Sequence, residues 1–159
     1  MDARPARATI ALGSNLGDRR AHLEAAVAAL GADPEIRVVA VSAWHETAPV
    51  GGPPGQGAYL NGAVEVETAL GARELLRRLL AIERSRGRVR GPERSAPRTL
   101  DLDLILYGDE IHDEPDLIIP HPRATARAFV LRPMAEIAPE RRFPPSGRTV
   151  RQQLAELGS

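Results

Sequence analysis

The stretch Leu100-Asp101-Leu102-Asp103-Leu104-Ile105-Leu106-Tyr107 decides the fold of this chain of 159 residues. Its leucines alternate with two aspartates and an isoleucine, and a Gly108-Asp109 turn follows. Neighbouring side chains of a strand point to opposite faces, so the four leucines are expected on one buried face and both aspartates on the other. The pattern therefore predicts a half-buried strand with an acidic outer face.

The hydrophobic pattern on either side of this strand predicts the remaining elements. Strands are expected over 9–12, 37–44 and 59–68, and helices after the capping residue Asp18 and over 72–86. The segment 47–57 is rich in glycine and proline and is expected to be a loop that covers a site. Extended pieces near Ile111 and over 117–120 come next, followed by helices over 128–137 and 149–157.

This order of elements predicts an α+β fold. The first six elements read βαββαβ, which is typical of a ferredoxin-like sandwich with two helices on one face of the sheet. The later segments add an extra C-terminal strand and helices. The length suits a single domain over residues 1–159.

Composition excludes several classes of protein. The formal net charge is zero, which argues against a protein that coats nucleic acid or an anionic membrane. There is no cysteine, so disulfides and thiolate chemistry are excluded. No apolar run approaches the roughly 18 residues that span a bilayer, and the first residues lack the apolar h-region of a signal peptide, so no such peptide is expected. We expect a cytoplasmic monomer that acts on small molecules.

The two aspartates of the opening stretch are candidate metal ligands. An Asp-x-Asp pattern is also common on solvated strand faces, but here the leucines fix the strand and hold both carboxylates in place. Two adjacent carboxylates repel unless a cation lies between them, and Mg²⁺ prefers one or two carboxylates together with phosphate oxygens and water. The pair Asp101 and Asp103 therefore predicts a magnesium site.

Six arginines lie just before this pair, and the chain has no lysine. Three of them are in the loop that leads to the aspartates and are expected to bind phosphate: Arg88, Arg90 and Arg98. The other three are expected to lie on a solvated surface: Arg84, Arg86 and Arg94. His121, fixed between two prolines, is a further candidate phosphate donor.

Two other functions fit parts of this pattern. Paired carboxylates with arginines would also serve a nucleotidyl transferase, which transfers a nucleoside monophosphate and releases pyrophosphate. A ferredoxin-like module that binds RNA is the second alternative, although it needs exposed aromatic residues and a basic face, and the predicted strands are rich in valine, alanine and leucine.

Five motifs together resemble the 6-hydroxymethyl-7,8-dihydropterin pyrophosphokinase family. They cover nearly the whole chain in the family's order: Ala11 to Asp18, Tyr59-Leu60-Asn61, Gly87 to Arg90, Pro97 to Asp103, and Pro120 to Arg123 with Arg127 to Leu131. The string from Pro97 to Asp103 is the most specific. Gly91 and Ser95 depart from the pattern, because some members carry a basic residue and a tryptophan there.

The resemblance implies an enzyme of folate synthesis that moves pyrophosphate from ATP to the pterin hydroxymethyl group and releases AMP. It implies that Asp101 and Asp103 hold two Mg²⁺ ions and act in catalysis with Arg88 and Arg98. The implied ATP-binding residues are Glu83, Arg88, Arg90, Arg98, Leu104, Ile118, His121 and Arg127. The implied pterin-binding residues are Thr47, Ala48, Val50, Tyr59, Asn61 and Phe129.

Overall fold

The computed structural model describes residues 5–47, 58–87 and 100–157. The main sheet contains β1 (Ala6–Ser14), β2 (Ile36–Val41), β3 (His45–Thr47), β4 (Tyr59–Thr68) and β5 (Asp101–Tyr107). Two helices connect these strands, α1 (Arg19–Ala32) and α2 (Ala72–Ser85). The C-terminal part contains β6 (His112–Glu114), β7 (Leu117–Ile119), a short 3-10 helix η1 (Ala124–Ala126), α3 (Ala128–Ile137), β8 (Arg142–Phe143), β9 (Arg148–Thr149) and α4 (Val150–Leu157).

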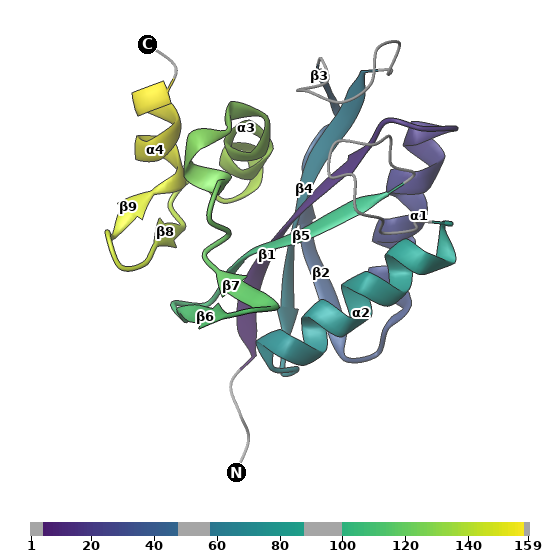
Figure 1. Ribbon diagram of the computed structural model, residues 1–159, viewed down its shortest axis with the longest axis horizontal. Helices are drawn as coiled ribbons and strands as arrows, with labels where there is room; N and C mark the ends of the chain where they lie inside the picture. The colour runs from purple at the N-terminus through teal and green to yellow at the C-terminus, as the bar shows by residue number, and fades with distance from the viewer. Residues whose placement is uncertain (1–4, 48–57, 88–99, 158–159) are drawn as a thin grey trace.

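The main sheet is antiparallel. Its strand order is β2-β4-β1-β5, and β3 also pairs with β4. The hairpins β6–β7 and β8–β9 form two small separate sheets. The predicted class, helices combined with an antiparallel sheet, is confirmed (Figure 1).

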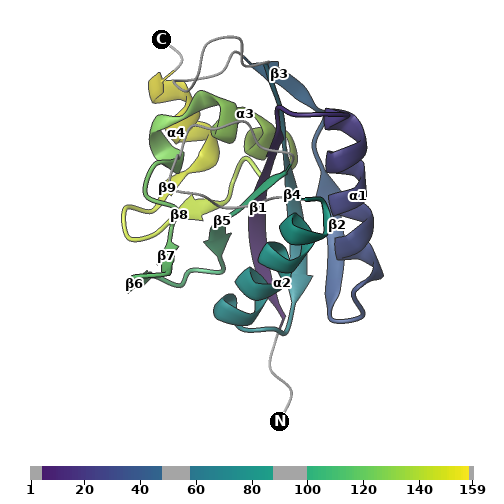
Figure 2. The same ribbon diagram turned by 45° about the vertical axis from the view of Figure 1, so that its right-hand side comes forward.

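Helices α1 and α2 cover one face of the sheet (Figures 1 and 2). The predicted cap of α1 is confirmed, since Asp18 Oδ1 accepts a hydrogen bond from the Ala21 N–H at 3.1 Å. The buried residues of the two helices include Leu23, Leu30, Leu75 and Leu79, which pack on the apolar face of the strands. Burial of this face supplies the main stabilisation of the fold.

Helices α3 and α4 lie over the opposite face, so the sheet has helices on both sides (Figure 1). Leu131, Met134 and Phe143 form a second core there. A buried carboxylate of the sheet contacts this layer. Glu65 of β4 accepts a hydrogen bond from Thr9 of β1 at 2.6 Å, and the Nε of Arg141, which follows α3, lies 3.6 Å from the same carboxylate. The predicted C-terminal helices thus form a second layer.

The prediction that all four leucines of the opening stretch share one face is wrong for Leu106. Thr9 pairs with Leu106 and Ile10 pairs with Leu104, so Ile105 is an extra residue in β5. This β-bulge reverses the alternation, because one inserted residue moves the next side chain to the other face. Leu106 is therefore buried in the second core, and Tyr107 in the first.

The largest differences from the predicted boundaries lie in β1, β2 and β3. Strand β1 is longer than the predicted 9–12, and β2 ends at Val41 instead of continuing to Trp44. Trp44 packs against the backbone at Gly62, where an added Cβ would lie 2.4 Å from its ring. The chain then forms the short strand β3, which the sequence does not predict; its last residue, Thr47, is the first residue of the predicted loop.

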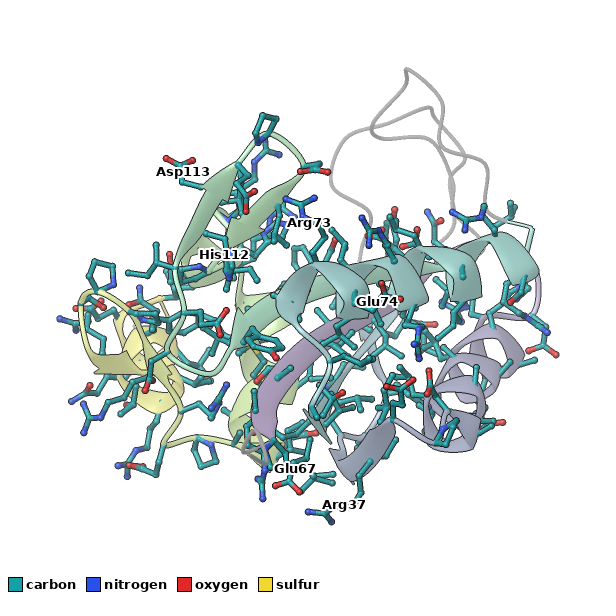
Figure 3. The ribbon with its side chains drawn as sticks, turned by 90° about the horizontal axis from the view of Figure 1, so that it is seen from below. Arg37, Glu67, Arg73, Glu74, His112 and Asp113 are labelled. Carbon is teal, nitrogen blue, oxygen red and sulfur yellow. The ribbon has the colours of Figure 1, made fainter. Side chains whose placement is uncertain are left out.

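Ion pairs bind the ends of several elements together (Figure 3). Arg37 of β2 donates to Glu67 of β4 at 2.8 Å, and hydrogen bonds from Arg37 and Arg7 lower the pKa of the Glu67 carboxyl. Arg73, at the start of α2, donates to Glu114 and to Asp116 and so joins the β6–β7 hairpin to the helix. Within the described ranges, no helix is long and apolar enough to cross a bilayer.

Candidate active site

Asp101 and Asp103 lie on the face of β5 that is turned away from α1 and α2. Leu100, Leu102 and Leu104 are buried in the core under the helices, so the two aspartates point the other way. The Asp103 side chain is 36% exposed to solvent. No group of three or more His, Cys, Asp or Glu side chains that could hold a metal occurs in the described part of the chain. A cation bound by this pair therefore needs further oxygen ligands from substrate or water.

The same face carries a polar pair two strands away. Gly13 of β1 pairs with Asp101 on one side and with Asn61 of β4 on the other. Asn61 is 5% exposed, and its Nδ2 donates to Thr47 Oγ1 at 2.6 Å. A Cβ on Gly13 would lie 3.0 Å from Asn61 Oδ1 and 3.6 Å from the Tyr59 ring. Glycine thus leaves room for the Asn61 carboxamide between the acidic pair and Thr47.

Glu83 of α2 supports the strand that carries the aspartates. It is 1% exposed, and its Oε2 accepts a hydrogen bond from the Leu102 N–H at 2.7 Å. Because β5 is the last strand in the sheet order, no further strand among the described residues lies at its outer edge to accept such a bond. The Glu83 carboxylate fills that role midway between Asp101 and Asp103.

His121 is held beside Asp103 by the bulge in β5. The His121 N–H donates to the carbonyl of Ile105, the inserted residue, at 3.0 Å. Its Nδ1 accepts from the Arg123 N–H at 3.4 Å, and its Nε2 lies 4.0 Å from Asp103 Oδ1. Burial, followed by the charge of Arg127, lowers the pKa of His121, although Asp101 acts in the opposite direction. The imidazole is therefore neutral at neutral pH, with its Nε2 proton facing the acidic pair.

A cavity of about 480 Å³ opens between β3 and the N-terminal end of α3. Three residues predicted to bind ligands line it, Thr47 on the β3 side and Arg127 and Phe129 on the α3 side. The Arg127 guanidinium lies 5.5 Å from the centroid of the Phe129 ring, within cation–π range. An aromatic ring beside polar and cationic groups is suited to a flat, polar heterocycle.

The structure places the other predicted residues as follows. Tyr59 and Asn61 lie on β4, next to the cavity residue Thr47. Leu104 is 5% exposed in the core under the helices, so its side chain is not on the acidic face. Ile118 is 44% exposed on β7. Five predicted residues are outside the described part of the chain: Ala48, Val50, Arg88, Arg90 and Arg98.

Three charged or titratable residues that line the cavity are not among the residues predicted from the sequence: His45, Glu46 and Arg132. They lie on β3 and α3, and only the tertiary packing of these two elements brings them together. Gly13, one of two glycines in the first motif, belongs to the resemblance without an implied role. Its close approach to Asn61 could not be anticipated without the strand register.

His22 connects α1 to the end of α2. The Arg86 Nε donates to His22 Nδ1 at 3.0 Å, directly before residues 88–99. Burial and the nearby Arg86 charge lower the pKa of His22, and Asp18 opposes them. A protonated ring could not accept this hydrogen bond.

The stability of the chain is therefore expected to depend on the protonation of His22. The unfolded chain binds this proton near pH 6.5 and the folded chain only at lower pH, so the stabilisation is present above pH 6.5 and is lost as the pH falls through the folded pKa. His22→Asn keeps an acceptor and removes the titration. Urea unfolding from pH 7.5 to 5 should show a smaller loss of stability in this variant, and equal losses would contradict the assignment.

Comparison with known proteins identifies the family. The family described as 7,8-dihydro-6-hydroxymethylpterin-pyrophosphokinase (HPPK) matches residues 9–139. The 2-amino-4-hydroxy-6-hydroxymethyldihydropteridine pyrophosphokinase of Pseudomonas aeruginosa is 45% identical over 149 residues, covering 94% of this chain and 90% of the relative. The protein of the same name from Methylorubrum extorquens is 47% identical over 152 residues, covering 95% and 93%.

Solved structures show the same fold. The Plasmodium falciparum HPPK-DHPS structure with pterin and p-hydroxybenzoate aligns with a TM-score of 0.74 at 14% identity. That alignment covers 98% of this chain but 43% of the Plasmodium chain, so this chain spans less than half of that chain's length. The match over residues 9–139 and the two bacterial relatives show that the chain belongs to the 7,8-dihydro-6-hydroxymethylpterin-pyrophosphokinase family.

Proposed function

We propose that this chain transfers a pyrophosphoryl group from ATP to the hydroxymethyl group of 6-hydroxymethyl-7,8-dihydropterin, releasing AMP, in folate biosynthesis. One observation carries the proposal beyond family membership. The strand register puts the acidic pair and the Asn61–Thr47 pair on one face of the sheet, with only Gly13 of β1 between Asp101 and Asn61. A phosphate donor and a heterocyclic acceptor bound to these two groups would meet over β1.

Asp101 and Asp103 are the proposed ligands of Mg²⁺. Two carboxylates on one face of a strand, next to the neutral His121, fit a hard cation that takes its remaining ligands from phosphate and water. Bound there, Mg²⁺ would neutralise charge on the triphosphate. The family resemblance implies two ions, and that number is part of the proposal.

The phosphates of ATP would be held by cationic and hydrogen-bonding side chains around this pair. The described candidates are the Nε2–H of His121 and Arg127, whose charge acts on His121. Arg88, Arg90 and Arg98, from the loop before β5, are proposed for the same task on the basis of the family motif. Glu83 would act indirectly by fixing the backbone of β5.

The pterin is proposed to bind in the cavity between β3 and α3. Phe129 would stack on its ring, while Asn61 and Thr47 would hydrogen-bond its polar edge. Tyr59 lies beside Asn61 and would contact the same ring.

In the proposed reaction, the main task of these residues is to position the reactants. The pterin hydroxyl oxygen forms a bond to the β-phosphorus while the bond from that phosphorus to the α-phosphate bridging oxygen breaks, and AMP leaves with that oxygen. The hydroxyl proton goes to solvent. Catalysis of this kind depends on in-line geometry and on stabilising charge.

An assay of AMP release tests the proposal. The chain with Mg²⁺ and ATP is expected to release AMP only when the pterin is added, and EDTA should abolish the reaction. Release of inorganic pyrophosphate with a nucleotidylated product would favour a nucleotidyl transferase and contradict the proposal.

Gly13→Ala is expected to weaken pterin binding. The new methyl group would press on Asn61 Oδ1 at 3.0 Å, so the carboxamide must turn away from its position on Thr47. Losing one such hydrogen bond corresponds to about a tenfold rise in the KM for the pterin. Steady-state kinetics would measure this, with Gly31→Ala as a control, because a Cβ there meets its nearest neighbour at 4.0 Å. An unchanged KM in Gly13→Ala would contradict the role of Asn61.

Several broader features stay proposals. We infer that the strand order β2-β4-β1-β5 represents a ferredoxin-like arrangement and that residues 1–159 act as one domain. The monomeric state and the cytoplasmic location are predictions of the sequence.

A further inference from the structure

The cavity proposed for the pterin has walls from two different elements. His45, Glu46 and Thr47 of β3 form one wall, and α3 contributes the other through residues that include Phe129 and Arg132. The distance between β3 and α3 therefore sets the width of the cavity. Whatever holds these two elements together determines how closely a flat ring is gripped.

The carboxylate of Glu136 makes two contacts across this gap. Its Oε1 accepts a hydrogen bond from the Ala43 N–H at 3.0 Å, and its Oε2 lies 2.8 Å from His45 Nε2. One side chain of α3 thus holds the backbone just before β3 and the first side chain of β3. Both groups are partly exposed, with 38% for Glu136 and 34% for His45.

Helix periodicity connects this contact to the cavity. Phe129, Arg132 and Pro133 line the cavity, and Glu136 follows them at the same helical spacing on α3. The contact with Ala43 and His45 therefore lies on the helix face that also presents the Phe129 ring. On the strand side, Thr47 is two residues from His45 and bonds to Asn61.

Strand β3 needs such support because it is short. It has three residues, and in the described part of the chain it pairs with one strand, β4. On its other side, Arg19 of α1 donates to Glu46 at 2.6 Å, which ties β3 to the first helix. Among the described residues, Glu136 is the hydrogen-bonding side chain of α3 that reaches this strand.

We propose that Glu136 and His45 form a positioning pair that fixes β3 against α3 and thereby sets the affinity of the enzyme for the pterin. This inference rests on the proposed function, because it takes the cavity as the pterin site. Neither side chain is assigned to the reacting atoms. Their loss should therefore affect pterin binding and leave the chemical step and nucleotide binding unchanged.

The test compares steady-state kinetics of the full chain and of Glu136→Ala. Removing the carboxylate deletes both contacts, and the loss of one or two partly exposed hydrogen bonds predicts a rise of about threefold to tenfold in the KM for the pterin. We expect kcat and the KM for ATP to stay within about twofold. A purely structural role would lower activity through the folded fraction and would not raise this one KM selectively.

Two further variants sharpen the result. His45→Ala removes the side-chain contact, together with one residue of the cavity wall, and leaves the Ala43 hydrogen bond. It should also raise the pterin KM, and it serves as the readout if Glu136→Ala does not fold. The double variant should match Glu136→Ala within about twofold, because the pair is already broken there. Glu140→Ala is the control, since Glu140 is exposed and pairs with Arg151 instead.

The outcomes separate this inference from the proposed function. A selective rise of the pterin KM in Glu136→Ala and His45→Ala, absent in Glu140→Ala, supports the positioning pair. An unchanged pterin KM, or an equal rise of the KM for ATP, would overturn it while leaving the proposed function intact. If the unaltered chain released no AMP in response to the pterin, the proposed function would fail, and this inference with it.

Discussion

Replacing Asp103 by alanine is expected to lower kcat by at least ~10³-fold while the chain stays folded. The carboxylate is proposed to hold Mg²⁺ on the triphosphate, and stabilisation of phosphate charge by a bound metal is worth several kcal/mol in such reactions. The side chain is 36% exposed and lies outside the apolar core, so the free energy of unfolding should change by about 0.5 kcal/mol or less.

The measurement is AMP release under saturating ATP and pterin, with thermal unfolding recorded on the same samples. Asp113→Ala is the matched control, because Asp113 is exposed on the β6–β7 hairpin and points away from the body of the protein (Figure 3). Its turnover should equal that of the unaltered chain. If Asp103→Ala kept more than a tenth of the original kcat, the metal assignment would have to be abandoned.

Glu83→Ala is expected to reduce both stability and turnover. The change leaves the Leu102 N–H at the edge of β5 without its acceptor, and an unsatisfied buried donor costs about 1–3 kcal/mol of unfolding free energy. Because this N–H lies between Asp101 and Asp103, a shift of the strand would also displace the acidic pair. Misplacement of about 1 Å can lower the rate ~100-fold.

Two further variants separate the effect on stability from the effect on turnover, measured by denaturant unfolding and by steady-state kinetics. Glu83→Gln keeps an oxygen acceptor for Leu102 and should retain most of the stability. Glu74→Ala lies on the same helix but is 42% exposed and pairs only with arginines, so it should change stability by less than about 1 kcal/mol (Figure 3). Equal losses in Glu83→Ala and Glu74→Ala would show that Glu83 has no special role under β5.

Local signals in the sequence predicted much of the fold. The alternating pattern over Tyr59–Thr68 predicted a strand, and β4 has these bounds although it is buried on both faces. The helical spacing of leucines after Ala72 reflects one buried face, and α2 is one residue shorter than the predicted helix. Asp18 was recognisable as a cap because its side chain needs only the next turn of backbone as a partner. Features of this kind depend on neighbours in the chain.

Features that depend on contacts between residues far apart in the chain could not be predicted from local sequence patterns. The inserted Ile105 disturbs the alternation only through its pairing with β1, so the position of Leu106 was mispredicted. The layer of α3 and α4 on the second face depends on contacts such as Arg141 with Glu65, which are 76 residues apart by their numbers. For the same reason the contact between His45 and Glu136 has no sequence signal.

Transfer of an intact pyrophosphoryl group is tested most directly by phosphorus NMR of one reaction mixture that contains the chain, Mg²⁺, ATP and 6-hydroxymethyl-7,8-dihydropterin. We expect AMP and a pterin diphosphate to appear in equal amounts as ATP disappears. Formation of ADP with a pterin monophosphate, or of free pyrophosphate with a nucleotidylated pterin, would contradict the proposed reaction.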